Sequence, residues 1–363
     1  MKLEDLLTEM VEKKASDIFL KPGQKPCLRV DNQIVPLDYP ELNTEDTKRL
    51  AYMLMNEAQA KFFETNPEMD LAYGIKGVGR FRVNIYRQRG SIAMVMRAIL
   101  TPELSFEDLN LPIVIKTMTE KRRGLILVTG TTGCGKSTTL ATMINHINNV
   151  RKCHIVTIED PIEYLHQDNV AIISQREVGF DTRSFHDALR QVLRQSPDVI
   201  LIGEMRDLET IKTAIQAAET GHLVLSTLHT VDAVQTVERI INYFPAYLHQ
   251  QIRMELALCL IGVISQRLLP RSEGLGRIPA VEIMINTPTI KKLIHEGRTL
   301  ELSQHIEQGG HVGMQTFNQS LLNLYKKRLI TYEDAILNAT SPDEFRLMAE
   351  GITSGVRAKE VST

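Results

Sequence analysis

Apolar residues recur at two different periods along the 363-residue chain, and the change between them divides it into parts. Near the N-terminus, residues 3–11 repeat apolar positions at helical spacing, which predicts an amphipathic helix. Short strand-like runs such as Asp17–Leu20 follow, and residues 44–65 again predict a helix. Residues 81–100 alternate between apolar and polar as a strand does. We therefore expect residues 1–100 to form a small α+β domain.

The pattern changes after a linker that we predict at residues 101–112. Four continuous apolar runs then alternate with helical patterns, and they lie at residues 124–128, 154–158, 199–202 and 223–226. Strands buried on both faces are typical of a parallel sheet covered by helices. We expect an α/β core at residues 113–288 and a helical C-terminal part at 289–353. Residues 354–363 show no apolar periodicity, which predicts a disordered tail.

A glycine-rich segment follows the first apolar run. Residues 130–137 read G-T-T-G-C-G-K-S and match the phosphate-loop pattern G-x-x-x-x-G-K-[ST] in full, between a predicted strand and a predicted helix. Backbone N–H groups and the helix N-terminus would surround a phosphate, Lys136 would reach the β- and γ-phosphates, and Ser137 would hold Mg²⁺. The matching context argues against a chance turn. The predicted ATP-binding residues here are Gly130, Thr131, Thr132, Gly133, Cys134, Gly135, Lys136, Ser137 and Thr138.

Acidic residues follow two further runs, at the ends where ligands bind in open α/β sheets. Glu204 ends the segment V-I-L-I-G-E, and we expect it to polarise the attacking water as a general base. The segment T-I-E-D-P-I-E places Glu159, Asp160 and Glu163 together, and such carboxylates repel each other unless a cation such as Mg²⁺ is present. Glu163 or Glu204 would then reach the metal through water. The alternatives are a surface acid at a strand end and an acidic turn at Pro161.

Two histidines flank the last of the four runs, in E-T-G-H-L-V-L-S-T-L-H-T. His229 stands at its C-terminal end, where it could sense the γ-phosphate. His222 stands at the opposite end and is expected to support the site. A structural role for both is the alternative, because a single histidine is more often structural.

Composition narrows the class of protein. Hydrophobic residues make up 43% and charged residues 24%, as in soluble globular proteins, and a net charge of −2 disfavours nucleic-acid binding. The four cysteines form no C-x-x-C pair, so neither a zinc site nor a disulfide framework is indicated, and Cys134 is interpreted as a tolerated small residue. The N-terminus does not resemble a signal peptide, and the longest apolar stretch, residues 256–264, is too short to span a membrane. We expect a cytoplasmic protein without direct membrane insertion.

Taken in order, these motifs resemble a known family. The phosphate loop, T-I-E-D-P-I-E, I-G-E-M-R-D and E-T-G-H-L-V-L-S-T-L-H-T closely resemble the type IV pilus retraction ATPases of the secretion ATPase superfamily. Further matches are G-R-F-R-V at 79–83, Q-R-E-V at 175–178 and G-M-Q-T at 313–316, so the resemblance runs to about Met348. It implies a PAS-like N-terminal domain, a RecA-like ATPase core and a homohexamer, with ATP held between the two domains and a neighbouring subunit.

The resemblance also implies roles for residues and partners. Glu204 would be the catalytic glutamate, with Glu163 and His229 beside it, and Glu159, Asp160 and His222 would complete the ATP site. Arginines of the first domain would stabilise charge on the phosphates, and the matching candidates are Arg80 for binding and Arg82 and Arg97 for catalysis. The ring would act on an inner-membrane pilus platform protein, at the cytoplasmic side of the pilus machine, alone or with a paralogous retraction ATPase.

Pilus assembly and type II secretion ATPases usually carry added N-terminal domains and a C-x-x-C insertion. This sequence starts with the expected PAS-like portion and has no C-x-x-C, which favours retraction. One departure concerns residues 289–296, which read T-I-K-K-L-I-H-E where retraction ATPases typically have A-I-R-N-L-I-R-E. Lys291 and His295 replace both arginines, and lysine does not reproduce a bidentate arginine contact. The sequence therefore leaves open an accessory paralogue, an assembly or secretion ATPase, a nucleotide-binding subunit with little hydrolysis, and a DNA-translocating motor.

Overall fold

A computed structural model describes residues 2–30, 33–75, 77–99, 105–274 and 276–351. The chain divides into two compact units, residues 1–101 with 163–165 and residues 102–162 with 166–363. The predicted tail and residues 101–104 of the predicted linker lie outside the described residues. Within the described part of that linker, Phe106 and Leu111 are buried in the core of the second unit.

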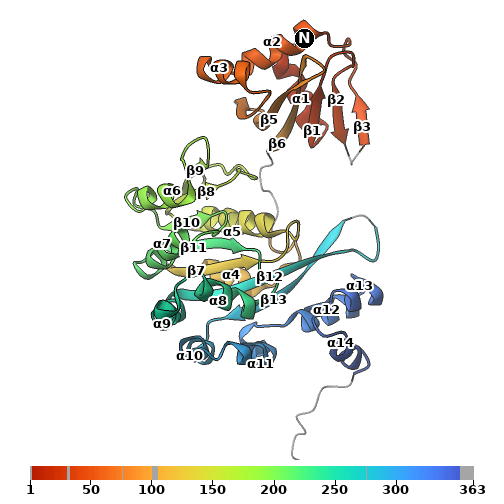
Figure 1. Cartoon of the computed structure of the whole chain (residues 1–363). Helices are drawn as coiled ribbons and strands as arrows, with labels where there is room; N and C mark the ends of the chain where they lie inside the picture. The colour runs from red at the N-terminus through yellow and green to blue at the C-terminus, as the bar shows by residue number, and fades with distance from the viewer. Residues whose placement is uncertain (1, 31–32, 76, 100–104, 275, 352–363) are drawn as a thin grey trace, which may run out of the picture. The chain divides into compact units, whose positions relative to one another are not determined.

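The first unit is an antiparallel sheet with strand order β3-β2-β1-β6-β5-β4 and helices packed against one face (Figure 1). Alternate strand residues such as Ile18, Phe81 and Met96 point into this core and are fully buried. The strands are β1 (Asp17–Leu20), β2 (Cys27–Val30), β3 (Gln33–Pro36), β4 (Glu68–Ile75), β5 (Gly79–Gln88) and β6 (Ser91–Ile99), and the helices are α1 (Leu3–Glu12), α2 (Thr44–Leu54) and α3 (Glu57–Thr65).

The single helix that we predicted over residues 44–65 is wrong, because two helices occupy this stretch. α2 ends before Met55, and Asn56 begins α3 by accepting a hydrogen bond from the Gln59 N–H while the Gln59 side chain accepts from the Asn56 N–H. This reciprocal pair is a capping box, which starts a new helix. The apolar spacing alone does not show the break.

The second unit is built on a seven-stranded sheet with order β13-β12-β7-β11-β10-β8-β9. All neighbouring strands are parallel except β12 and β13, which form an antiparallel pair. The four predicted runs are strands, so these predictions are confirmed, but the sequence analysis missed β9, β12 and β13. The strands are β7 (Gly124–Thr129), β8 (His154–Glu159), β9 (Ile172–Glu177), β10 (Val199–Ile202), β11 (Leu223–Leu228), β12 (Leu260–Pro270) and β13 (Arg277–Ile285).

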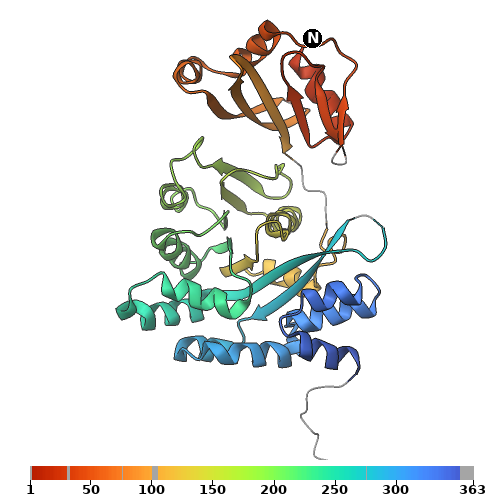
Figure 2. The same cartoon turned by 45° about the vertical axis from the view of Figure 1, so that its right-hand side comes forward.

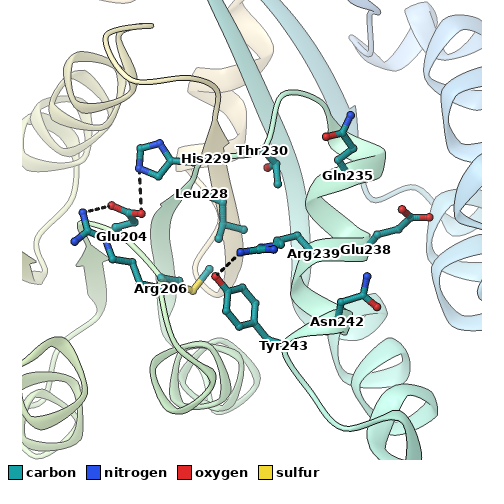
Figure 3. A pocket seen from close by; sticks show the side chains of 11 residues that line it. Glu204, Arg206, Leu228, His229, Thr230, Gln235, Glu238, Arg239, Asn242 and Tyr243 are labelled. Atoms are coloured by element: carbon teal, nitrogen blue, oxygen red, sulfur yellow. Dashed lines mark hydrogen bonds and ion pairs between the residues drawn. The ribbon is translucent and has the colours of Figure 1, made fainter.

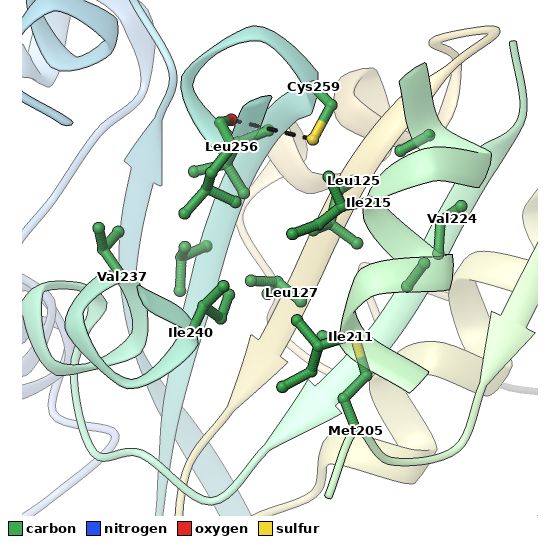
Figure 4. Packing of buried hydrophobic residues seen from close by; sticks show 14 of the residues in the cluster. Leu125, Leu127, Met205, Ile211, Ile215, Val224, Val237, Ile240, Leu256 and Cys259 are labelled. Atoms are coloured by element: carbon green, nitrogen blue, oxygen red, sulfur yellow. Dashed lines mark hydrogen bonds between the residues drawn. The ribbon is translucent and has the colours of Figure 1, made fainter. Parts of the chain in front are cut away.

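Helices cover both faces of this sheet, as the alternation of β7 shows. Leu125 and Leu127 face α7, α8 and α9 in one core (Figure 4). Ile126 and Val128 face α4 and α5 in the other core. The helices are α4 (Ile113–Thr119), α5 (Lys136–Val150), α6 (Phe185–Val192), α7 (Leu208–Glu219), α8 (Ala233–Asn242), α9 (His249–Cys259), α10 (Pro288–Glu296), α11 (Leu302–Gln308), α12 (Phe317–Lys326), α13 (Tyr332–Leu337) and α14 (Pro342–Ala349), with 3-10 turns η1 (Ala246–Leu248), η2 (Thr299–Glu301) and η3 (Gly309–Val312).

The last helices pack on the β12–β13 hairpin. Leu269, Ile278 and Ala280 of the hairpin form one buried cluster with Phe317 of α12 and Phe345 of α14, and Figure 2 shows the hairpin beside these helices. The C-terminal helices therefore share a core with two strands of the central sheet. Among the described helices, none combines the length and apolar character that crossing a membrane requires.

Candidate active site

The glycine-rich loop joins the buried end of β7 to the start of α5. Gly130 has φ of 138°, and a Cβ there would lie 2.5 Å from both the Cys134 Sγ and the Gln266 carbonyl oxygen. Gly133 and Gly135 also have positive φ, of 80° and 95°, and Gly135 caps α5. Glycine adopts this left-handed region without a steric cost, so the loop turns tightly into the helix N-terminus.

Lys136 lies inside this turn. Its Nζ donates to the carbonyl oxygens of Gly130 at 2.8 Å and Thr131 at 3.0 Å, so the ammonium group faces the concave side of the loop. Ser137 is the next helical residue, at the end of α5 where backbone N–H groups have no partner within the helix. The structure thus joins the predicted phosphate-binding groups in one turn. Burial raises the pKa of the Cys134 thiol, which fits a packing role for this residue.

Two residues of β12, which the sequence analysis did not single out, support the loop. The Ser265 hydroxyl accepts a hydrogen bond of 2.9 Å from Thr129, the residue before Gly130. The Gln266 amide and the Thr139 hydroxyl of α5 are hydrogen-bonded, with the amide nitrogen donating at 2.8 Å. All four side chains are at least nine-tenths buried. No local motif marks these residues, because the contacts depend on β12 pairing with β7.

Glu204 follows β10, and His229 follows the neighbouring strand β11. Its carboxylate accepts from the Arg206 guanidinium at 2.8 Å and contacts the His229 Nε2 at 3.0 Å (Figure 3). Burial acts to raise the pKa of this carboxyl, but the hydrogen bonds from Arg206 and His229 outweigh it and hold the pKa of Glu204 below its ordinary value. The group is therefore an ionised base at neutral pH, held in place from two sides.

A pocket of about 540 Å³ opens at this point. Its walls come from the turn after β10, the end of β11 and the outer face of α8 (Figure 3). Tyr243 stacks beneath the Arg239 guanidinium, 5.0 Å from the ring centre. The lining residues are Glu204, Met205, Arg206, Leu228, His229, Thr230, Gln235, Glu238, Arg239, Asn242 and Tyr243. Glu204 therefore lies at the wall of a polar cavity, where water has access to it.

The acidic segment after β8 lies on the same edge of the sheet. Glu159 accepts from the Thr157 hydroxyl at 2.6 Å and from the Gln175 amide at 3.2 Å, so it is fixed by its neighbours. Glu204, Arg206 and His229 form one cluster, called the Glu204 cluster below. The hydrogen bond with Glu204 and the charge of Glu204 raise the pKa of Arg206, and the charge of Asp160 contributes further, so Asp160 lies within electrostatic range of this cluster. Glu163 groups with the first unit rather than the second, so its catalytic role stays a prediction.

His222 does not join this cluster. It precedes β11, which pairs in register with β7 from Leu223 opposite Gly124, so it lies at the end of the strands away from the phosphate loop. Its Nδ1 contacts the Ala217 carbonyl oxygen at 2.9 Å. Within this unit His222 therefore lies away from the phosphate loop, and the ATP-binding role that the resemblance implied for it stays a prediction.

The three candidate arginines lie on the outer face of the first unit's sheet. Arg82 and Arg97 are cross-strand partners on β5 and β6, and Arg80 is two residues along β5 on the same face. Buried Asp17 accepts from Arg97 at 2.9 Å and pairs with Arg29 at 3.2 Å. Cross-strand register thus concentrates guanidinium groups around one carboxylate, a surface that favours anions.

Comparisons with known proteins place this geometry in a family. The family model for type II/IV secretion system proteins matches residues 1–335. The type IV pilus ATPase PilU of Pseudomonas aeruginosa is 45% identical over 348 residues, which are 96% of this chain and 91% of that protein. The retraction ATPase PilT of the same organism is 44% identical over 95% of this chain and 100% of its own length. The chain belongs to the PilT/PilU type of type IV pilus ATPases.

The fold of a PilT/PilU-type ATPase agrees with a solved structure. A crystal structure of the pilus retraction motor PilT with bound ADP matches 95% of this chain and 98% of its own, at 47% identity and a TM-score of 0.87. The α/β architecture with a RecA-like ATPase core is therefore confirmed. As the family hydrolyses ATP, the phosphate loop and the Glu204 cluster are the parts of this chain suited to that reaction.

Proposed function

We propose that this PilT/PilU-type chain is a motor that couples ATP hydrolysis to type IV pilus retraction and so to twitching motility. The observation that carries the proposal is the Glu204 cluster. An ionised carboxylate, fixed by Arg206 at 2.8 Å and His229 at 3.0 Å, stands at the same sheet edge as a complete phosphate loop. The relatives that match along nearly the whole chain support the pilus as the system on which it acts.

In this proposal the phosphate loop binds the nucleotide, and Glu204 and His229 act on the γ-phosphate and the attacking water. The loop N–H groups and Lys136 hold the phosphates, and nucleotide binding draws the Lys136 ammonium from the carbonyls of Gly130 and Thr131 to phosphate oxygens. Glu204 accepts a proton from the attacking water. His229, in contact with Glu204, reports the state of the γ-phosphate to the turn that leads into α8.

Magnesium would supply charge neutralisation between the phosphates. Ser137, at the N-terminus of α5, offers a hydroxyl ligand. Within the described residues no group of three or more His, Cys, Asp and Glu side chains could enclose a metal. A single hydroxyl ligand from Ser137 fits Mg²⁺, which usually keeps several waters and binds few protein groups beside substrate phosphates. Glu204 or Glu163 would contribute through water.

The finer architecture is also part of the proposal. The first unit would be PAS-like, with its Arg80, Arg82 and Arg97 directed to phosphates in an assembled ring. Six copies would form a homohexamer at the cytoplasmic side of the inner membrane, acting on a pilus platform protein alone or with a paralogous ATPase. The domain divisions that the sequence predicts, at residues 1–100, 113–288 and 289–353, stay a prediction within this proposal.

The test is steady-state ATP turnover of E204Q with E238Q as a matched control. Glu238 lines the same pocket but is held by the Thr299 hydroxyl at 2.9 Å and does not stand at a strand end. We expect E204Q to lose at least about a hundredfold in kcat, a typical size for loss of a general base, while ADP affinity stays within about threefold. E238Q should stay near wild type. Wild-type turnover in E204Q would show that the base is misassigned.

A further inference from the structure

Glu282 is a buried carboxylate that the proposed reaction does not use. It lies on β13 and is 8% exposed, and its Oε1 accepts from the backbone N–H of Ala233 at 2.9 Å. Ala233 is the first residue of α8, four positions after His229. The backbone N–H of Phe317, the first residue of α12, lies close enough to the same carboxylate to lower its pKa. One side chain thus lies at the N-termini of two helices that are distant in sequence, and it is hydrogen-bonded to the first of them.

The position of Glu282 in the sheet connects it to the phosphate loop. Its cross-strand partner on β12 is Ser265, and the partner of Ser265 on β7 is Thr129. Residues in register share one face of a sheet, and the Ser265 and Thr129 hydroxyls are hydrogen-bonded at 2.9 Å. The residue after Thr129 is Gly130, the first of the loop. A row of three polar residues therefore runs from the loop to Glu282.

The surroundings of Glu282 disfavour its charged form, so a contribution to stability does not by itself explain a carboxylate at this position. Burial raises its pKa to about 7, although the N–H groups of Ala233 and Phe317 and the charge of Arg267 act in the opposite direction. The charged groups that face it are Asp232 at the start of α8 and Arg267 on β12, and α12 has no charged residue before Lys326. The Arg267 guanidinium stacks 3.8 Å from the Phe317 ring centre and donates to the Asn338 carbonyl oxygen. An apolar residue would fill this place at a lower cost.

We propose that Glu282 is a positioning residue that couples the nucleotide site to the C-terminal helices, by holding the first turns of α8 and α12 at the end of the Thr129–Ser265 row. A change at the loop or at His229 reaches α12 through this junction. The inference rests on the proposed function, because it needs nucleotide to bind at the loop. α12 packs on the β12–β13 hairpin with α14, so the junction passes a nucleotide-dependent shift to the whole C-terminal cluster.

The test compares ADP-induced changes in hydrogen–deuterium exchange, measured by mass spectrometry on peptides covering residues 229–242 and 313–326. In the wild-type protein we expect ADP to change exchange at least twofold in both peptides. E282M keeps a similar length but has no acceptor, so the response of residues 313–326 should vanish while ADP affinity stays within threefold. E282Q retains one acceptor oxygen and should show a reduced response. T299V, which removes the hydroxyl that holds Glu238 farther along α8, should respond as wild type does.

The possible outcomes separate the two proposals. No ADP binding by the wild-type protein would contradict the proposed function itself. Binding without a response in residues 313–326, or a full response in E282M, would overturn the coupling role. Loss of ADP affinity in E282M would also overturn it, because Glu282 would then support the site directly. Should E282M fail to fold, a response of wild-type size in E282Q has the same meaning.

Discussion

Arg82 on β5 and Arg97 on β6 are directly opposed cross-strand partners. Like charges in this relationship destabilise a sheet, so the pair has a cost to the fold that Asp17 offsets only at Arg97. A pair of guanidinium groups that repel each other is suited to receive a polyanion. The arrangement supports the prediction that these two arginines bind negatively charged phosphate groups rather than stabilise the fold.

Replacing Arg82 by Ala should therefore separate function from stability. We expect R82A to leave the free energy of unfolding unchanged or to raise it by a few tenths of a kcal/mol, because the repulsion is removed. ATP turnover should fall by about a hundredfold or more, as when an arginine that stabilises phosphoryl transfer is lost. R49A is the control, since Arg49 is an exposed residue of α2 that pairs with Asp46 at 3.5 Å. Equal losses of turnover in both variants would contradict the prediction.

The phosphate loop allows a matched pair of glycine substitutions. G130A places a Cβ 2.5 Å from the Cys134 Sγ and the Gln266 carbonyl oxygen, and we expect it to cost about 3 kcal/mol or more and to abolish ADP binding. G133A has no atom within 4 Å of its Cβ and suffers only from its φ of 80°, at about 1–2 kcal/mol. Urea unfolding and calorimetric ADP titration would measure both effects. If G133A proved the more damaging variant, the close contact at Gly130 would not be decisive.

Glu282 should give stability a pH dependence of known sign. Its pKa rises from 4.5 in the unfolded chain to about 7 in the folded protein, so the folded state binds more protons between these values. Stability contributed by this group is complete below pH 4.5 and is lost as the pH rises through about 7, by about 3 kcal/mol at most.

The comparison of wild type with E282Q isolates the part of the stability that depends on ionisation of Glu282. The neutral amide cannot ionise, so the stability of E282Q relative to wild type should increase between pH 5.5 and pH 8. Urea unfolding midpoints at the two pH values would measure the change, and the other ionisable groups cancel in the difference. A constant difference between the two proteins across this range would contradict the raised pKa of Glu282.

Cys134 should be chemically quiet although it lies in the phosphate loop. Burial raises the pKa of its thiol, which lowers the thiolate fraction at neutral pH, and its side chain is 4% exposed. We expect a thiol reagent at pH 7.5 to modify the partly exposed Cys27 first and to leave ATP turnover intact. C134A should keep turnover within about twofold. Rapid loss of turnover on modification, prevented by C134A, would instead indicate a redox-sensitive loop.

The sequence predicts the phosphate loop and the strand ends well, because these are local signals. A strand, a glycine pattern and a helix follow one another directly from β7 to α5, and the acids at Glu159 and Glu204 each stand at the end of a buried run. The hairpin was missed for a physical reason. The apolar run at residues 256–264 covers the end of α9 and the start of β12, and such a run does not distinguish a helix from a strand.

Arg206, Gln266 and Glu282 escaped prediction because their contacts are tertiary. Arg206 lies within I-G-E-M-R-D, but only the fold turns its guanidinium back onto Glu204. Gln266 meets Thr139 across 127 positions of sequence, and Glu282 reaches Ala233 across 49. Asn56 is different, since the spacing Asn-x-x-Gln that starts α3 was present in the sequence as a capping signal.

The shared core between the β12–β13 hairpin and the last helices limits how this protein can be divided. Leu269, Ile278 and Ala280 are covered by α12 and α14, so a chain ending at residue 288 would keep the catalytic sheet and present an apolar ribbon to water. Such a fragment would aggregate rather than persist as a free ATPase. The central sheet and the C-terminal helices therefore depend on each other for folding, and an exchange of this region with that of a relative would have to include the hairpin together with its helices.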